Sequence, residues 1–401
     1  MQKKIIALAV AGAIGSIVAG SVFAADAPAT VYGRIDYGYQ STSGDSGGLK
    51  NQKSTNAFAS GIEAGSRIGI KGASDLENGL KAIYEVEFGI YLDQASGPDA
   101  ASKTGAVTSS GSDAKWTNRH SYIGVTGDFG TAVGGRLDGV RYGIFQAYDP
   151  FGAGGMGNFT QVTRQVDRAN NAIAYITPNF SGFSGLVAYG TAILGAEAGG
   201  AGLGGLNPKT GEAAGNLGDF KLNTIMGKYE QGPLSVTLDW EQVTAGNIGS
   251  GAGVAGSLSD KITVTTVGGS YDLGVAKVSA LYDQLQDTLD SVGDIQKTVN
   301  MLIGVKVPVN AFTFKANYGK SQNKLSGVTD GDTTKFGLGL DYALSKSTNL
   351  YADYGSITNG TGAAIAISAA ANAYGPTGSY GGGSVGLGGA TGIDFGMALK
   401  F

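Results

Sequence analysis

Few side chains in this chain could carry out covalent or acid–base chemistry. His120 is the only histidine among 401 residues, and there is no cysteine. Ser121 follows His120 directly, but successive residues of a strand point to opposite faces, so the two cannot act as nucleophile and base. Disulfides and thiolate ligands are excluded, and a single histidine leaves few possible metal sites. We therefore expect no catalytic residue, no cofactor, no metal site and no enzymatic activity.

The chain carries a small excess of negative charge. It has 28 basic and 32 acidic residues, and its formal net charge is −4 at pH 7. Nucleic-acid binding requires lysine and arginine to neutralise phosphates, so this balance argues against a nucleic-acid partner. Seventy glycines and nineteen tyrosines accompany only eight prolines. A soluble core does not explain this mixture well.

The N-terminus has the organisation of a secretory signal peptide. Lys3 and Lys4 precede a mostly apolar run that ends at Phe23, and small residues lead to a cleavage site after Ala24. A membrane-anchoring helix is the alternative, but glycine and serine residues interrupt the run. We predict that residues 1–24 are removed on export and that the remaining chain, 25–401, forms a single domain.

Polar and apolar residues alternate along many short segments after the signal. Arg34 and Asp36 share one face of residues 31–39, opposite apolar side chains, and Glu85 and Glu87 are placed in the same way further on. No later stretch approaches the roughly 18 continuous apolar residues that a membrane-spanning helix requires. A bilayer leaves backbone groups unsatisfied unless the strands form a closed sheet, so a membrane protein with this pattern must be a β-barrel.

Sixteen segments of this kind fit the chain, with connections of two lengths between them. The expected strands are 31–39, 67–71, 80–91, 119–125, 131–136, 171–175, 186–189, 222–229, 234–243, 262–271, 275–285, 298–307, 312–318, 336–342, 349–354 and 391–401. The short connections include 74–79, 128–130, 231–233, 272–274 and 345–348, and the long ones include 93–115, 137–165, 192–219, 245–260 and 357–390. Short turns on one side and long loops on the other are typical of a transmembrane barrel.

Several local strings together resemble the Gram-negative general porins, most closely their β-proteobacterial branch. The resemblance covers essentially the whole chain after the signal. It rests on Tyr32-Gly33-Arg34, the strings 66–72 and 118–125, Gly127-Asp128-Phe129-Gly130, Gly135-Arg136, Asp149-Pro150-Phe151-Gly152, the string 342–346 and the terminal Phe401.

The resemblance implies an all-β fold, a sixteen-stranded antiparallel transmembrane barrel whose third extracellular loop folds into the lumen. It also implies a homotrimer in the outer membrane, in contact with the lipid bilayer and lipopolysaccharide. The expected function is passive diffusion of ions and small hydrophilic solutes.

In this family, basic side chains on the barrel wall face acidic residues on the inward-folded loop. The resemblance places Arg34, Arg67, Arg119, Arg136 and Arg168 on the wall, and Asp138 and Asp149 on the acidic side. Asp167, Arg141 and Arg164 are further candidates. Arginine suits the wall because its guanidinium stays charged and makes directed hydrogen bonds. Five arginines against two or three aspartates predict a mild anion preference.

One feature of the alternation conflicts with this assignment. Arg119 shares its strand face with Ile123 and Val125, which would bring two apolar side chains into the lumen. A β-bulge or another register would resolve the conflict.

Three other functions remain open at the level of sequence. A substrate-selective channel would carry a ladder of binding residues and would show saturable flux. An outer-membrane enzyme would require an active site that a single histidine makes improbable. An exported adhesin or other soluble β-protein would share the signal and the alternation, but would not need detergent.

Overall fold

The structure is a computed structural model that describes residues 29–44, 55–93, 117–152, 154–163, 167–191, 221–244, 261–289, 293–325, 331–359 and 389–401. The predicted signal peptide, residues 1–24, and large parts of the predicted long connections lie outside these ranges. No helix in the described ranges is long and apolar enough to cross a membrane.

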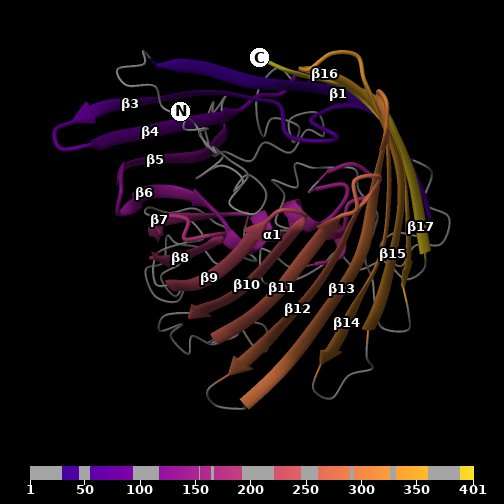
Figure 1. Ribbon diagram of the computed structural model, residues 1–401. Coiled ribbons are helices and arrows are strands. Elements are labelled where there is room, and N and C mark those ends of the chain that lie inside the picture. Colours follow the sequence, from indigo (N-terminus) through magenta and orange to yellow (C-terminus); the bar gives the residue numbers. More distant parts are fainter. Residues whose placement is uncertain are drawn as a thin grey trace, which may run out of the picture.

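The described strands form one closed antiparallel sheet (Figure 1). They are β1 (Thr30–Gly44), β2 (Thr55–Ser60), β3 (Arg67–Leu76), β4 (Leu80–Gly89), β5 (Thr117–Gly127), β6 (Gly130–Asp138), β7 (Arg168–Ile176), β8 (Phe183–Gly190), β9 (Lys221–Gln231), β10 (Leu234–Thr244), β11 (Lys261–Asp272), β12 (Lys277–Leu289), β13 (Gly293–Val309), β14 (Phe312–Leu325), β15 (Gly331–Ala343), β16 (Thr348–Asn359) and β17 (Gly389–Lys400).

Pairing of the first strand with the last closes the sheet. Arg34 on β1 lies opposite Lys400 on β17, and the pairing continues from there along both strands. On its other side β1 pairs with β2 and then with β3, so these two short strands occupy one position in the wall. The barrel therefore has sixteen strand positions, which confirms the predicted sixteen-stranded antiparallel barrel.

The sequence pattern missed β2 and the segment that separates it from β3. After Ser60 the chain leaves the wall at Gly61, which has a φ of +74°, and Ile62 is buried. The Gly155 amide donates a hydrogen bond of 2.8 Å to the Ile62 carbonyl. Residues 61–66 thus enter the lumen and contact a part of the chain that is distant in sequence.

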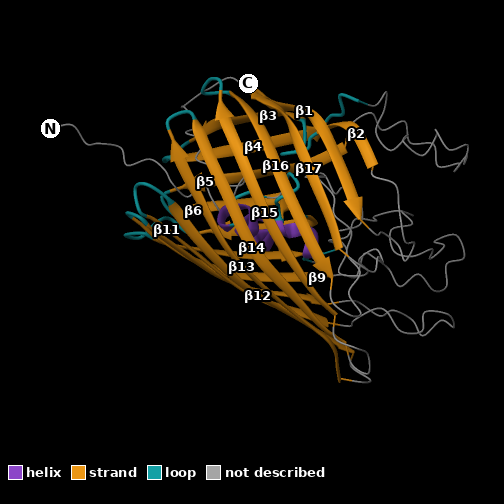
Figure 2. Ribbon diagram, turned by 90° about the vertical axis from the view of Figure 1, so that its right-hand side faces the viewer, coloured by secondary structure: helices purple, strands orange, loops and turns teal. Residues whose placement is uncertain are grey.

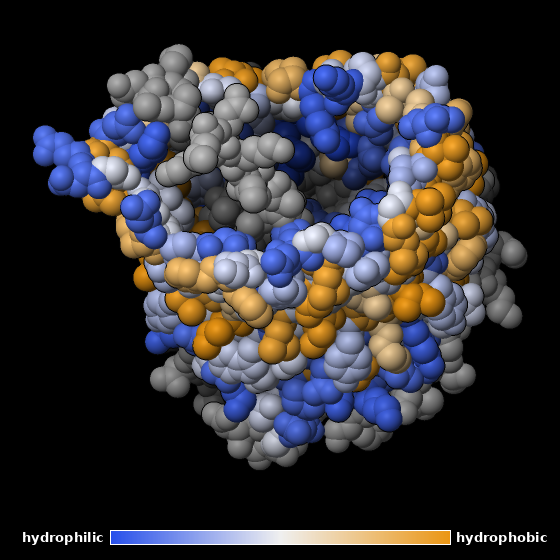
Figure 3. Space-filling model, viewed as in Figure 1, coloured by the Kyte–Doolittle hydropathy of each residue, from blue (hydrophilic) through white to orange (hydrophobic). Residues whose placement is uncertain are grey.

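The two faces of the wall differ as the alternation predicts. On β10, Leu238 and Trp240 are exposed on the outside, whereas Thr237, Asp239 and Glu241 are buried on the lumen side. Figure 3 shows apolar residues in a band on the outer wall and hydrophilic residues around the hollow of the barrel. Such a surface fits a bilayer outside and water inside.

Tight turns connect the strands at one end of the barrel, as Figure 2 shows. Asn78 and Gly79 have φ values of 63° and 77°, and Asn310, Gly232 and Gly274 also adopt positive φ. Glycine and asparagine tolerate this conformation, so these turns need few residues. In an outer-membrane barrel this end faces the periplasm.

Candidate functional site

The connection between β6 and β7 folds into the lumen, as the resemblance implied. It contains the helix α1 (Val140–Tyr148) and the short 3-10 helix η2 (Phe159–Val162). Figure 1 shows α1 inside the ring of strands. Here the wall formed by β10–β17 is called the loop-bearing wall, because this inner loop is attached to it.

Helix α1 is fixed to the loop-bearing wall by polar contacts. The Arg141 guanidinium donates to both carboxylate oxygens of Asp283, at 2.6 and 2.7 Å, and both side chains are almost fully buried. The Tyr148 hydroxyl lies 2.8 Å from that of Thr237. Tyr148 also packs against Gly268, where a Cβ would collide with its ring. Arg141 therefore positions the loop and does not face the pore.

The loop continues along the same wall after α1. Pro150 packs on Gly304, where a side chain would collide with its ring. The Met156 amide donates to Asp394 at 2.6 Å, and the Lys335 ammonium donates to the Met156 carbonyl at 2.5 Å. These contacts hold the loop against the loop-bearing wall.

Asp149 holds the loop together and does not pair with the predicted arginines. Its carboxylate accepts hydrogen bonds from the amides of Phe151 and Phe159, at 3.1 and 2.6 Å, and from Asn317 on β14 at 2.8 Å. Burial raises the pKa of Asp149 to about 6, against the opposing effect of these hydrogen bonds. Its expected role as an acidic partner across the pore is corrected: it is buried inside the loop.

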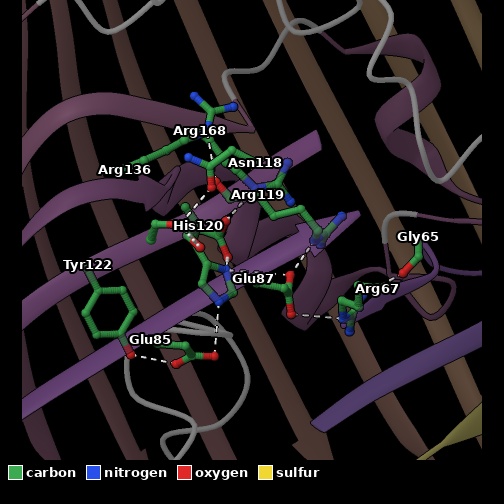
Figure 4. A network of polar contacts seen from close by, with 12 residues as sticks. Gly65, Arg67, Glu85, Glu87, Asn118, Arg119, His120, Tyr122, Arg136 and Arg168 are labelled. Carbon is green, nitrogen blue, oxygen red and sulfur yellow. Dashed lines mark hydrogen bonds and ion pairs between the residues drawn. The ribbon is translucent and has the colours of Figure 1, made fainter. Parts of the chain in front are cut away.

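The opposite side of the lumen, formed by β1 and β3–β7, is here called the arginine-bearing wall. In Figure 4, Arg67 and Arg119 both reach Glu87. The Arg67–Glu87 distance is 3.2 Å, and Arg67 also donates to the Gly65 carbonyl. One carboxylate on β4 thus holds two guanidinium groups from β3 and β5 side by side.

Asp138 joins the same network at the end of β6. Its carboxylate lies 3.0 Å from Arg168 on β7 and 3.2 Å from the ring of His120 on β5. Arg136 donates to Asn170 and to the Arg119 carbonyl. Asp138 is therefore brought together with the wall arginines, but it belongs to the wall itself and not to the inner loop.

Arg34 forms a second cluster next to this network. Its guanidinium lies 2.5 Å from Glu63 and 3.6 Å from Asp36. Asn349 donates to Glu63, and the Tyr351 hydroxyl donates to Asp36. Residues 61–66 bring Glu63 to this place, and no alternation pattern in the sequence predicted that excursion.

An irregularity in the pairing of β4 with β5 explains how Arg119 reaches the lumen. Val86 pairs with Ser121 but Phe88 pairs with Asn118, so β5 carries an extra residue at this point. Such a bulge turns neighbouring side chains toward the same face. Arg119 contacts the lumenal Glu87, whereas Ile123 remains 69 % exposed on the outer face. A second bulge, between β6 and β7, lies next to Arg136.

The structure adds carboxylates that the predicted site lacked. The described residues place six of them beside the five wall arginines: Asp36, Glu63, Glu85, Glu87, Asp138 and Asp167. The expected excess of five arginines over two or three aspartates is therefore corrected. The alternation of residues 80–91 places Glu85 and Glu87 on a polar face, and this pattern was the sequence signal that could have added them to the predicted site. Arg164 lies outside the described residues.

The exposure of these charges is unequal. The Arg67 side chain is 26 % exposed and that of Arg119 is 11 % exposed, whereas their partner Glu87 is only 3 % exposed. Burial raises the pKa of Asp167 to about 6, although Arg168 beside it opposes the shift. At Glu87, guanidinium groups are thus more exposed than the carboxylate, whereas Glu63 (18 %) and Asp138 (20 %) are more exposed than their partners Arg34 (10 %) and Arg168 (4 %). The described residues contain no group of three or more acidic, histidine or cysteine side chains suited to a metal ion.

Comparisons with known proteins agree with this architecture. A model of the Gram-negative porin family matches residues 7–363. Outer membrane porin protein 32 of Delftia acidovorans is 29 % identical over the full length of both chains, and a porin of Bordetella pertussis is 28 % identical over 81 % of this chain and 85 % of its own. The solved anion-selective porin from Comamonas acidovorans has a TM-score of 0.69 and 26 % identity, covering 93 % of this chain and 99 % of that one.

Barrel, inward-folded loop and charged wall are thus accompanied by sequence similarity along nearly the whole chain. The family consists of channels and not of enzymes. The chain belongs to the Gram-negative porin family and is an outer-membrane β-barrel channel for ions and small hydrophilic solutes.

Proposed function

We propose that this channel passes anions more readily than cations, through the opening between the inner loop and the arginine-bearing wall. The observation that carries the proposal is the unequal exposure on that wall, where Arg67 and Arg119 stand in front of Glu87. The similar porin from Comamonas acidovorans is described as anion-selective.

The expected preference is modest. In water, one charge acts on an ion 4 Å away with about 1 kcal/mol, which corresponds to roughly a fivefold change in local concentration. Salt screens charges beyond about 8 Å at physiological ionic strength, so the nearest groups dominate. Because Glu87 lies behind Arg67 and Arg119, and Glu63 and Asp138 are partly exposed, the fields of the two signs cancel in part, and a permeability ratio of a few fold follows.

The test is the reversal potential of purified protein in a planar bilayer under a KCl gradient. The wild type is expected to be anion-selective. R67Q and R119Q should each lower the ratio of chloride to potassium permeability by about twofold to fivefold. K346Q, in the exposed turn after β15, serves as a control and should leave the ratio unchanged. A cation-selective wild type would refute the proposal.

We propose further that residues 1–24 are a cleaved signal and that three copies assemble in the membrane, in contact with lipopolysaccharide. An aromatic patch on β1, β2 and β17 supports an interface on the outer wall: Phe58 contacts Tyr37 and Tyr39, and Tyr39 contacts Phe395. The mass of the protein purified from outer membranes tests the cleavage. Cross-linking in intact cells tests the trimer, and a monomer alone would contradict it.

A further inference from the structure

His120 lies between two carboxylates on the arginine-bearing wall. Its Nδ1 is 3.2 Å from Asp138 on β6. Its Nε2 is 3.1 Å from Glu85 on β4, as Figure 4 shows. The side chain is only 3 % exposed, so it is in contact with its protein partners and not with passing solute. The bulge in β5 places it next to Arg119 in the same network.

The hydrogen bonds around these carboxylates define what the imidazole must supply. Glu85 accepts hydrogen bonds from the hydroxyls of Tyr32 and Tyr122, at 2.5 and 2.7 Å, and Asp138 faces the Arg168 guanidinium at 3.0 Å. Both acids are therefore surrounded by donors, as carboxylates are. A neutral imidazole has one N–H and one lone pair, so one carboxylate would face a lone pair. Only the imidazolium ion donates to both.

The charge count of this network depends on His120. Its described ion pairs involve three guanidinium groups, those of Arg67, Arg119 and Arg168, and three carboxylates, those of Glu85, Glu87 and Asp138. These six charges cancel. A neutral His120 adds no charge to these six groups, and an imidazolium adds one positive charge.

We propose that His120 is an imidazolium ion at neutral pH and that its charge sets the anion preference of the pore. The second part of this inference rests on the proposed function, whereas the first part concerns the protonation state alone. His120 acts through Glu85 and Asp138, so it is a positioning and charge-setting residue that does not bind the solute.

Every element packed against His120 contributes a charged or titratable group. They are Glu85 and Glu87 on β4, Arg119 and Tyr122 on β5, Arg136 and Asp138 on β6, Arg168 on β7, and Tyr32 on β1. The ordinary pKa values are about 10 for tyrosine, above 12 for arginine and about 4 for carboxylic acids. As the pH is raised from 7, the imidazole of His120 is thus the group among these whose charge is expected to change first.

Because the chain contains a single histidine, its protonation state can be measured directly. Untagged protein with ¹⁵N-labelled histidine, folded in detergent micelles, gives the ring-nitrogen resonances of His120 alone. At pH 7 we expect the imidazolium pattern, with both nitrogens protonated. The pattern of a neutral tautomer at pH 7 would overturn the inference, whatever the selectivity of the pore.

Variants then test the effect on selectivity. H120Q removes the charge and should lower the chloride-to-potassium permeability ratio by about twofold to fivefold at low salt. H120R retains the charge and should keep the ratio near that of the wild type. As the pH is raised from 7, the wild-type ratio should fall toward that of H120Q, whereas the H120R ratio stays constant.

The two proposals fail in different ways. A wild type that selects cations refutes the proposed anion preference, while the nuclear magnetic resonance experiment still decides the charge of His120. An imidazolium pattern together with equal permeability ratios in H120Q and H120R would refute the role in selectivity. If H120Q does not fold, as judged by heat-modifiable migration on gels, the wild-type pH profile against H120R decides alone: a ratio that does not change with pH refutes the role.

Discussion

The loop-bearing wall and the arginine-bearing wall enclose the same lumen, but they use charged residues differently. On the loop-bearing wall, Asp283 and Lys335 are fully buried and bind the inner loop. On the arginine-bearing wall, Arg67 is partly exposed while its acidic partner lies behind it. A buried ion pair returns little net stability after desolvation, but removing one partner is costly. Charge on the first wall therefore fixes the position of the inner loop, and we propose that charge on the second acts on the solute.

The largest expected effect comes from breaking the anchor of α1. D283N removes the charge of the carboxylate that accepts two hydrogen bonds from the buried Arg141 guanidinium, and breaking such a buried pair costs about 3–5 kcal/mol. We expect a lower unfolding temperature in detergent and larger, noisier single-channel currents, because the loop is no longer fixed. The double variant R141L/D283L is the control and should recover most of the lost stability. If the single-channel currents of D283N are as low in noise as those of the wild type, the anchoring role is contradicted.

A smaller effect on stability should come from the protonation of Asp149, which depends on pH. Its pKa is raised from 3.8 to about 6 in the folded protein, so the folded state holds the proton more tightly than the unfolded state does. This group therefore adds stability at low pH, and that contribution is lost as the pH rises from about 4 through 6. Its size is about 3 kcal/mol, since one pKa unit corresponds to about 1.4 kcal/mol. Unfolding temperatures of the wild type between pH 4 and 7 should show this decline, and D149N should show less of it.

The packing of Pro150 on Gly304 should contribute to the stability of the folded protein by a similar or smaller amount than the protonation of Asp149. G304A adds a methyl group where Pro150 packs, and we expect a loss of about 1–3 kcal/mol from overpacking. Gly227 on β9 is a matched control, because a Cβ there meets no atom within 4 Å. Equal unfolding temperatures for G304A and G227A would show that the loop does not depend on this contact.

The smallest expected change in free energy is the effect of the arginine-bearing wall on ion selectivity. E87Q removes the carboxylate behind Arg67 and Arg119 and should raise the chloride-to-potassium permeability ratio, by an amount equivalent to about 1 kcal/mol or less. The same substitution on the loop-bearing wall, E241Q, should leave the ratio nearly unchanged. Reversal potentials at low and high salt measure both. A decrease in the ratio of E87Q would mean that Glu87 matters mainly by holding the arginines in place.

Local sequence patterns predicted the wall more accurately than the site. Alternation located the sixteen strand positions because it repeats every two residues and needs no knowledge of the partner strand. It missed β2, which is six residues long and is followed by the inward excursion at Gly61. The five wall arginines came from family resemblance. Glu63 was not predicted, because an excursion between two short strands brings it to Arg34.

The sequence by itself determined that the chain is a membrane barrel with a polar lumen and an apolar exterior. In a bilayer every backbone group needs a hydrogen-bond partner, so the sheet must close into a barrel. The two-residue alternation of polar and apolar side chains along each strand is enough to reveal this fold in the sequence. Tertiary structure alone decided which charges meet. The bulge beside Arg119, the burial of Asp149 inside the loop and the two carboxylates around His120 all depend on pairing between distant strands. One added residue in a strand changes the face of its neighbours, and no local pattern contains that information.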